Sequence, residues 1–323
     1  MPYDLSILIP ARHEMFLQKT IDDILSHIEA DTEIIVVLDG EWSDPPLMQS
    51  DRVNIIYSPK VVGQRAATNM AARIAQGKYL MKVDAHCSFD QGFDRKMIAE
   101  MHDDWTMVPM MRNLWAFDWV CPDGHRRYQS PSGPCGKCKK ATKREITWRT
   151  RAERGETARE QWNGRKSPEN ASYCFDTEPH FKYFREFTKR AEGQGDITPT
   201  MSLQGSCFMC TRERYFALNL CDESLGSWGS QGIEVACKTW LSGGAVMCNK
   251  KTWYAHLFRT QGGDFGFPYQ QDEARIQQNR KQVRDLFFNN QWPLQKRPIS
   301  WLLEKFWPVK GWTEDDLKKL KPL

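Results

Sequence analysis

The sequence predicts an α/β protein whose central, Rossmann-like mixed sheet is flanked by helices. Two observations support this fold class. Apolar runs of strand length alternate with amphipathic helical segments over the first hundred residues, as they do in open α/β sheets. The alternation lapses over residues 112–195 and returns near residue 198, which indicates an irregular basic subdomain inserted into the sheet domain.

The first half predicts a strand, a helix, two strands, a helix and a strand. These strands are expected at residues 5–9, 33–38, 53–57 and 78–83, and the helices at residues 14–28 and 64–75. Pro10, Asp39 and Asp84 follow three of the strands. Because ligands of open α/β sheets bind beyond the carboxyl ends of the strands, we expect these three residues to surround one crevice.

The second half predicts further elements of the same sheet. A buried strand is expected at 201–210, helices at 212–218 and 233–241, a strand at 245–248, and an aromatic segment at 253–259. Cys207 and Cys210 are predicted to lie in the core on opposite faces of their strand. A charged helix at 272–288 and a tryptophan-rich end are expected to wrap around the domain.

The strand that ends at Asp84 carries a candidate metal site. In an extended chain, alternation with a period of two places Asp84 and His86 on one face, with Ala85 pointing away. A carboxylate oxygen beside an imidazole nitrogen suits Mn²⁺ or Mg²⁺ holding a phosphate-bearing substrate. The alternative is a strand that ends in a turn, where Asp84 caps the turn and His86 is merely exposed.

Composition indicates a soluble protein. Of the 323 residues, 40% are hydrophobic and 27% charged, and no apolar stretch is long enough to span a membrane. The ten cysteines are scattered through apolar segments or set in C-x-x-C spacing, which suits a reducing compartment. We therefore expect a cytoplasmic protein with no membrane partner. No glycine-rich phosphate loop is found in the sequence, which argues against a dinucleotide-binding enzyme and a nucleoside triphosphatase.

The irregular middle contains a possible zinc knuckle. Cys121 and His125 form a C-x3-H, and Cys135 and Cys138 form a C-x2-C. Four such ligands could close a tetrahedral Zn²⁺ site. The alternative is a pair of turns that contain free thiols.

A basic stretch at residues 139–166 follows the knuckle, with Trp148 and Trp162 among ten lysines and arginines. Basic residues interleaved with aromatic ones are typical of phosphate binding combined with base stacking. The alternative is an exposed helical face that is simply solvated.

Five motifs, in the same order along the chain, resemble the catalytic domain of the polypeptide N-acetylgalactosaminyltransferases, within the GT-A class that includes family 2 glycosyltransferases. The resemblance covers roughly residues 4–100 and 198–260. The motifs are the first strand and turn that carry Pro10, Ala11 and Glu14, the segment Gly-Gln-Arg65-Ala-Ala, Asp84-Ala-His86-Cys, the turn from Trp228 to Glu234, and His256-Leu-Phe-Arg.

The resemblance implies a GT-A fold and a Mn²⁺-dependent, retaining transfer of a sugar from a UDP-sugar to a hydroxyl. Asp84, His86 and His256 would bind the metal, which would neutralise charge on the leaving UDP. Arg65 would contact the nucleotide, and Asp39 the uridine or ribose. Pro10, Ala11 and Glu14 would belong to the same donor site.

The resemblance also implies a catalytic side formed by Trp228, Gln231 and Glu234. Glu234 would orient donor or acceptor, although a glutamate at a helix N-terminus is also an ordinary capping residue. Gln231 stands where the family has a carboxylate that reads sugar hydroxyls, so the transferred sugar is not predicted.

The acceptor is expected to be a macromolecule. The basic stretch favours a hydroxymethylated base of phage-type DNA, whereas the family favours Ser or Thr hydroxyls of a protein. Of these two acceptors, we slightly prefer DNA. The reaction is expected in the cytoplasm of a bacterium or a phage-infected host cell. A non-catalytic nucleic-acid-binding module is the third hypothesis. We expect a nucleotide-sugar half at 1–111, the basic insert at 112–195, an acceptor half at 196–260 and a helical tail at 261–323.

Overall fold

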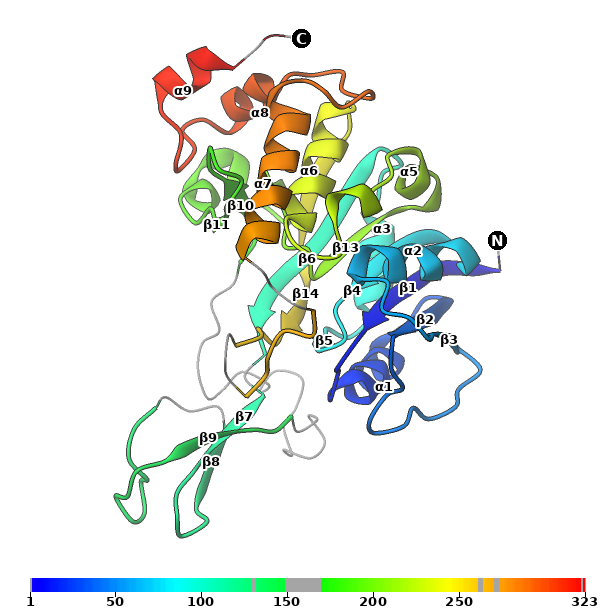
Figure 1. Ribbon diagram of the computed structural model, residues 1–323, viewed down its shortest axis with the longest axis vertical. Helices are drawn as coiled ribbons and strands as arrows, with labels where there is room; N and C mark the ends of the chain where they lie inside the picture. The colour runs from blue at the N-terminus through cyan, green and yellow to red at the C-terminus, as the bar shows by residue number, and fades with distance from the viewer. Residues whose placement is uncertain are drawn as a thin grey trace.

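A computed structural model describes residues 2–114, 116–128, 132–148, 170–260, 264–269, 273–320 and 322. A nine-stranded mixed sheet forms its centre, in the order β12-β14-β6-β13-β4-β1-β2-β3, with β5 paired to β14 (Figure 1). Strands β4, β1, β2 and β3 are mutually parallel, whereas β13 runs antiparallel to both of its neighbours, β4 and β6. The central sheet is therefore mixed, as the sequence predicts.

The strands of this sheet come from both halves of the chain. They are β1 (Tyr3–Ala11), β2 (Thr32–Asp39), β3 (Val53–Ser58), β4 (Gly77–Val83), β5 (Cys87–Phe89), β6 (Trp105–Asn113), β12 (Ile197–Pro199), β13 (Cys207–Thr211) and β14 (Ala245–His256). Because β13 lies between β4 and β6, the segments 1–111 and 196–260 share one sheet. Their boundaries as separate halves remain a prediction.

Helices cover both faces of the sheet. They are α1 (Leu17–His27), α2 (Gln64–Ile74), α3 (Phe93–Ala99), α5 (Arg212–Ala217), α6 (Gln231–Leu241), α7 (Glu273–Phe288), α8 (Ile299–Phe306) and α9 (Glu314–Lys319), with short 3₁₀ turns η1 (Phe187–Lys189), η2 (Ala191–Gly193) and η3 (Glu223–Leu225). Apolar side chains of α1 and α3 pack on one face of the sheet, and those of α2, α5, α6, α7 and α8 pack on the other. Cys207 and Cys210 are buried in the two opposite layers, as predicted.

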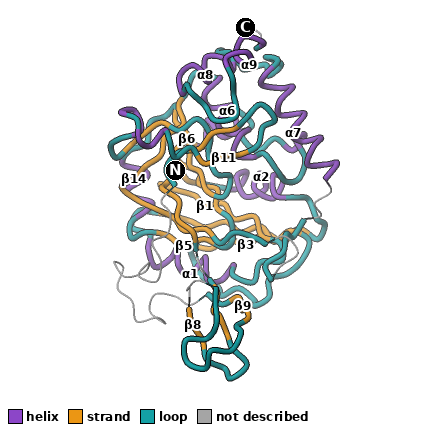
Figure 2. The backbone as a smooth tube through the Cα atoms, turned by 90° about the vertical axis from the view of Figure 1, so that its left-hand side faces the viewer, coloured by secondary structure: helices purple, strands orange, loops and turns teal. Residues whose placement is uncertain are grey.

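Two small sheets lie outside the central one. Strands β7 (Phe117–Val120), β8 (Arg126–Tyr128) and β9 (Lys143–Ile146) form the first, and β10 (Tyr173–Phe175) and β11 (Phe181–Tyr183) form the second. The β7–β9 sheet projects from one end of the molecule, opposite the end that holds α8 and α9 (Figures 1 and 2). It belongs to the predicted insert, whereas residues 149–166 of the basic stretch lie outside the described residues.

Three local predictions need correction. The strand expected at 201–210 begins only at Cys207, because the backbone around Leu203 and Gly205 packs against Gly232, where a Cβ would lie 2.0 Å from the Leu203 oxygen. The strand expected at 245–248 continues as β14 to His256 through an irregularity between Asn249 and Trp253. Asp84 to His86 form a turn after β4 rather than an extension of that strand.

The C-terminal helices pack on the domain, as the tryptophan-rich sequence predicts. Trp240 of α6 contacts both Trp301 and Phe306 of α8 with its ring. Trp312 is 8% exposed and donates from its indole nitrogen to the Phe175 oxygen at 2.8 Å. Within the described part of the chain, no helix combines the length and the apolar character needed to cross a bilayer.

Candidate functional site

A pocket opens at the carboxyl ends of β1 and β4 and beside the end of β14. Its cavity of about 380 Å³ is lined by charged, polar and aromatic side chains, among them Arg12, Glu14, Asp84, His86, Trp228 and His256. The position follows from topology, since the parallel strands β1 and β4 end at the same sheet edge. The sequence-predicted crevice is therefore present, with Pro10 and Asp84 in its wall.

Three predicted metal ligands meet in this pocket. Asp84 Oδ2 lies 3.2 Å from His256 Nε2 and 3.9 Å from His86 Nε2. One possible ligand atom from each residue lies within 4.8 Å of the others. Antiparallel pairing of β14 with β5 brings His256 opposite Cys87, next to His86, although the two histidines are 170 positions apart in the chain. One carboxylate oxygen and two imidazole nitrogens are a donor set that suits Mn²⁺.

Charge around the site keeps these groups in their metal-binding forms. Burial disfavours the Asp84 carboxylate, but Lys82, His256 and His86 outweigh burial and lower its pKa below the usual range. Burial lowers the pKa of His256 to about 4, against the opposing effect of Asp84. A neutral imidazole and an ionised carboxylate can both donate lone pairs to a cation.

Glu14 orients His86. Its Oε2 lies 3.0 Å from His86 Nδ1, and its Oε1 pairs with Arg259. A proton held between Nδ1 and the carboxylate leaves the Nε2 lone pair free on the side of Asp84. Glu14 therefore has the position of a carboxylate that orients a metal-binding histidine from the side away from the metal. It also lines the pocket.

The comparisons with known proteins agree with this geometry. The family model "Glycosyl transferase family 2" matches residues 6–203. The chain belongs to glycosyl transferase family 2. A relative in Drosophila melanogaster, a putative polypeptide N-acetylgalactosaminyltransferase 13, is 21% identical over 289 residues, covering 83% of this chain and 44% of the relative.

A solved structure of GalNAc-T7 with UDP, GalNAc and Mn²⁺ has a similar fold. Its TM-score is 0.61 at 16% sequence identity, and the match covers 98% of this chain and 54% of that one. The chain therefore spans about half the length of these relatives. The fold is of the GT-A type, as the sequence motifs predict for a member of family 2.

Arg65 lies outside the pocket wall, and its predicted contact with the nucleotide remains a prediction. Its side chain is 1% exposed, and its guanidinium donates to Glu234 at 2.9 Å, to the Gly226 oxygen at 3.0 Å and to the Gly229 oxygen at 2.6 Å. With these acceptors around it, Arg65 connects α2 to α6 and to the loop before α6.

Glu234 likewise lies outside the pocket wall, and its predicted catalytic role remains a prediction. It is fully buried, and its carboxylate accepts from Arg65, from Lys238 Nζ at 2.9 Å and from the Asp222 backbone at 2.9 Å. Two cations and a backbone N–H thus occupy the carboxylate. The motif that contains Glu234 is a structural connection between helices.

Asp39 organises the loop before α2 instead of facing the cavity. Its carboxylate is fully buried and accepts from the backbone of Val62 at 2.7 Å, from Gly63 at 2.9 Å and from the Tyr269 hydroxyl at 2.9 Å. Tyr269 lines the pocket. Asp39 therefore contacts the site through Tyr269 and through its backbone oxygen, which accepts from the pocket residue Arg12 at 2.9 Å. Ala11, which is 2% exposed, is a core residue at the end of β1.

Trp228 and Gln231 do lie in the pocket wall. Trp228 is 37% exposed and meets Phe267 edge to face, with ring centroids 5.6 Å apart. Gln231, at the start of α6, directs its amide nitrogen to Cys221 Sγ at 3.1 Å. Their predicted part in catalysis remains a prediction.

Sequence reasoning missed Lys82. Its ammonium group is buried and donates to Asp84 Oδ1 and, at 2.8 Å, to the Gly205 oxygen. Gln64 also donates to Asp84 Oδ1, at 3.1 Å. The spacing of two between Lys82 and Asp84 was a usable signal, because an extended chain places such residues on one side.

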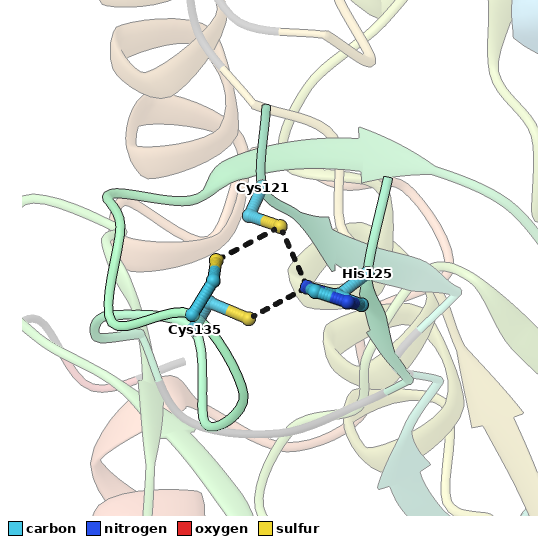
Figure 3. A group of neighbouring side chains, drawn as sticks. Cys121, His125 and Cys135 are labelled. Atoms are coloured by element: carbon cyan, nitrogen blue, oxygen red, sulfur yellow. Dashed lines mark hydrogen bonds between the residues drawn. The ribbon is translucent and has the colours of Figure 1, made fainter. Parts of the chain in front are cut away.

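The predicted zinc ligands also come together, in the β7–β9 sheet. Figure 3 shows the side chains of Cys121, His125 and Cys135 pointing toward one another. The sulfur of Cys138 lies 3.5 Å from that of Cys121, and one ligand atom from each of the four residues lies within 4.8 Å of the others.

Proposed function

We propose that the protein is a metal-dependent glycosyltransferase that moves a sugar from a UDP-sugar to a hydroxyl group. The observation that carries this proposal is the convergence of Asp84, His86 and His256 in a pocket at the carboxyl ends of the strands. Family 2 membership supports the reaction class. The structure of GalNAc-T7 with UDP, GalNAc and Mn²⁺ supports the donor class and the metal.

A bound Mn²⁺, or Mg²⁺, would neutralise negative charge on the diphosphate of the leaving UDP. Asp84, His86 and His256 would hold the ion, and Glu14 would keep the His86 ring in the orientation that presents Nε2. Lys82 keeps the carboxylate of Asp84 ionised. The chain thus supplies a preorganised cation site, which needs little rearrangement when the donor binds.

The pocket favours a mechanism without a protein nucleophile. Among its described lining residues, the only carboxylates are Glu14 and Asp84. Glu14 is engaged by His86 and Arg259, and Asp84 by Lys82 and the two histidines. The paired catalytic carboxylates of most glycosidases are therefore not found in this wall. This arrangement supports retention on one face of the sugar, with a leaving-phosphate oxygen receiving the acceptor proton.

For the acceptor, we propose a Ser or Thr hydroxyl of a protein in preference to DNA. Both reported relatives are named as GalNAc-transferases, one of them acting on polypeptides. In the described part of the basic stretch, Lys140 pairs with Asp123 at 2.5 Å and Arg144 with Asp264 at 3.2 Å. These pairs reduce the charge available to phosphates. The tests below can also indicate that the acceptor is DNA or that the protein binds nucleic acid without catalysis.

The first test measures UDP release. Purified protein is incubated with Mn²⁺ and a panel of UDP-sugars, with and without EDTA. We expect release with at least one donor, abolition by EDTA, and a loss of at least a hundredfold in Asp84→Ala and His256→Ala. Asp51→Ala, at an exposed position, is the matched control. If no donor gives UDP release, or if Asp84→Ala and the wild type release UDP equally, the proposed glycosyltransferase activity is refuted.

The second test identifies the acceptor. Peptides rich in Ser and Thr and duplex DNA with hydroxymethylated bases are incubated with the active donor and analysed by mass spectrometry. A mass increase on the peptides equal to the sugar residue of the active donor supports the proposal. Transfer to DNA alone, falling steeply as salt rises, would refute the protein acceptor and restore the DNA hypothesis.

A further inference from the structure

The β7–β9 sheet has very little apolar core of its own. Within residues 116–128 and 132–148, the buried apolar side chains are Ala116, Phe117, Cys121, Cys135 and Trp148. Two of these five are cysteines of the four-residue cluster, and Trp148 packs against Phe16 of the main domain. A unit this small is commonly stabilised by disulfides or a metal ion. The small apolar core therefore indicates that a disulfide or a metal ion joins these cysteines.

The distances between the cluster atoms match the edges of a zinc tetrahedron. Zn–S bonds of about 2.3 Å and Zn–N bonds of about 2.0–2.1 Å give S–S edges of about 3.8 Å and S–N edges of about 3.6 Å. His125 Nδ1 lies 3.5 Å from Cys121 Sγ and 3.6 Å from Cys135 Sγ, and the sulfurs of Cys121 and Cys138 are 3.5 Å apart (Figure 3). Each edge agrees to within about 0.3 Å.

Two tight turns deliver these ligands. In the first, the Cys121 N–H bonds to the His125 oxygen at 3.1 Å, and Gly124 has a positive φ of 77°. In the second, the Lys139 N–H bonds to the Cys135 oxygen at 2.9 Å, and Lys139 itself has a φ of 64°. A left-handed conformation is costly for lysine, so a constraint at Cys135 and Cys138 would explain why it is kept.

The surroundings suit thiolates that carry a metal. Lys137 and Lys139 lie in the same turn and supply positive charge, whereas Lys140 pairs with Asp123. Three thiolates and one imidazole around Zn²⁺ carry a net charge of −1, which nearby lysines would offset. A disulfide between Cys121 and Cys138 would need its sulfurs at about 2.05 Å instead of 3.5 Å.

We propose that Cys121, His125, Cys135 and Cys138 bind a structural Zn²⁺ ion that holds the β7–β9 sheet together. This ion shares no ligand with the Mn²⁺ proposed for the donor pocket, so the inference stands independently of the glycosyltransferase reaction. All four positions of the tetrahedron are filled by side chains, which is the arrangement of structural rather than catalytic zinc.

The zinc unit also connects to the donor pocket. Arg144 of β9 lies 3.2 Å from Asp264, and the neighbouring Phe265 meets the His86 ring edge to face at 5.1 Å. The Arg259 guanidinium lies over the same Phe265 ring, 4.4 Å from its centre. Loss of zinc should therefore disturb the position of His86 through β9 and Phe265.

The test is metal analysis in a background that cannot bind metal in the donor pocket. The Asp84→Ala, His256→Ala double variant is purified under reducing conditions, dialysed against metal-free buffer without a chelator and analysed by inductively coupled plasma mass spectrometry. We expect about one zinc per chain, because a closed site with thiolate ligands retains its metal. Zinc below about a tenth of an equivalent per chain would overturn the proposal.

Ligand variants in the same background test the assignment. Cys135→Ser and Cys138→Ser should lose zinc, whereas Cys174→Ser, at a buried cysteine outside the cluster, should keep it. Zinc retained in both cluster variants would overturn the assignment. In case serine variants fold poorly, Co²⁺ is exchanged into the double variant with its four ligands intact. Tetrahedral thiolate bands in the visible spectrum support the proposal, and octahedral Co²⁺ without sulfur charge-transfer bands refutes it.

Discussion

The buried contacts of Arg65 predict that this residue stabilises the fold and does not bind the donor. In Arg65→Met, Glu234 loses one of its two cations, and the Gly226 and Gly229 oxygens lose their donor. Breaking a buried ion pair by removing one partner costs about 3–5 kcal/mol. With an unfolding entropy of about 2.1 cal/mol/K per residue over 323 residues, this cost lowers Tm by about 4–7 °C.

The assay is thermal unfolding followed by circular dichroism, together with donor KM measured well below Tm. Arg52→Met is the matched control, because Arg52 and Asp31 form an exposed pair whose loss should change Tm by about 1 °C or less. We expect Arg65→Met to keep the donor KM within about threefold. The same change with Glu234→Gln should destabilise by less than the sum of the two single changes, because the residues are in contact.

An unchanged Tm accompanied by a tenfold rise in donor KM would refute this reasoning. It would return Arg65 to the nucleotide-binding role that the sequence motif implies. A lowered Tm with an unchanged KM would confirm Arg65 as the connection between α2 and α6.

Three further predictions concern the pocket. Glu14→Gln should weaken Mn²⁺ binding by about 10–100-fold, because it removes the carboxylate behind a metal-binding histidine. It should also lower Tm, because Arg259 loses its buried partner. Isothermal titration calorimetry below Tm measures the affinity, and an unchanged affinity contradicts the prediction. Lys82→Met should tighten Mn²⁺ binding severalfold, because a cation no longer competes for Asp84; weaker binding in the same titration would show that Lys82 supports the site. Gly232→Ala should destabilise the protein by about 1–3 kcal/mol and reduce UDP release, since its Cβ meets the backbone at 2.0 Å. Gly266→Ala, which has open space, is its control in urea unfolding, and equal stability of the two variants would argue against the close packing.

The elements of the first half could be predicted from sequence because local pattern decides them. The strands ending near Pro10, Asp39 and Asp84 and the helix beginning at Gln64 were all placed within a few residues. The cysteine and histidine cluster could also be foreseen, since its ligands lie within 18 positions of one another. In both cases a short separation along the chain limits how far apart the residues can lie in the structure.

The direction of individual side chains was decided by tertiary structure. Arg65 and Glu234 belong to motifs near the donor site, but packing of α2 against α6 turns both toward a buried ion network. Lys82 gains its role because β13 and its preceding loop bring the Gly205 oxygen to its ammonium group. No local pattern encodes such partners, because they come from elements more than 100 positions away.

The sequence by itself determined the fold class, the sheet edge where the site lies, and the residues Asp84, His86 and His256 as candidate ligands. Only the tertiary structure decided which charged residues face the cavity and which form ion pairs with one another away from it. The physical reason is that burying a charge is costly unless it is paired. Arg65 and Glu234 meet this cost by pairing with each other, whereas the site groups Asp84 and His86 are held by Lys82 and Glu14 at the pocket wall.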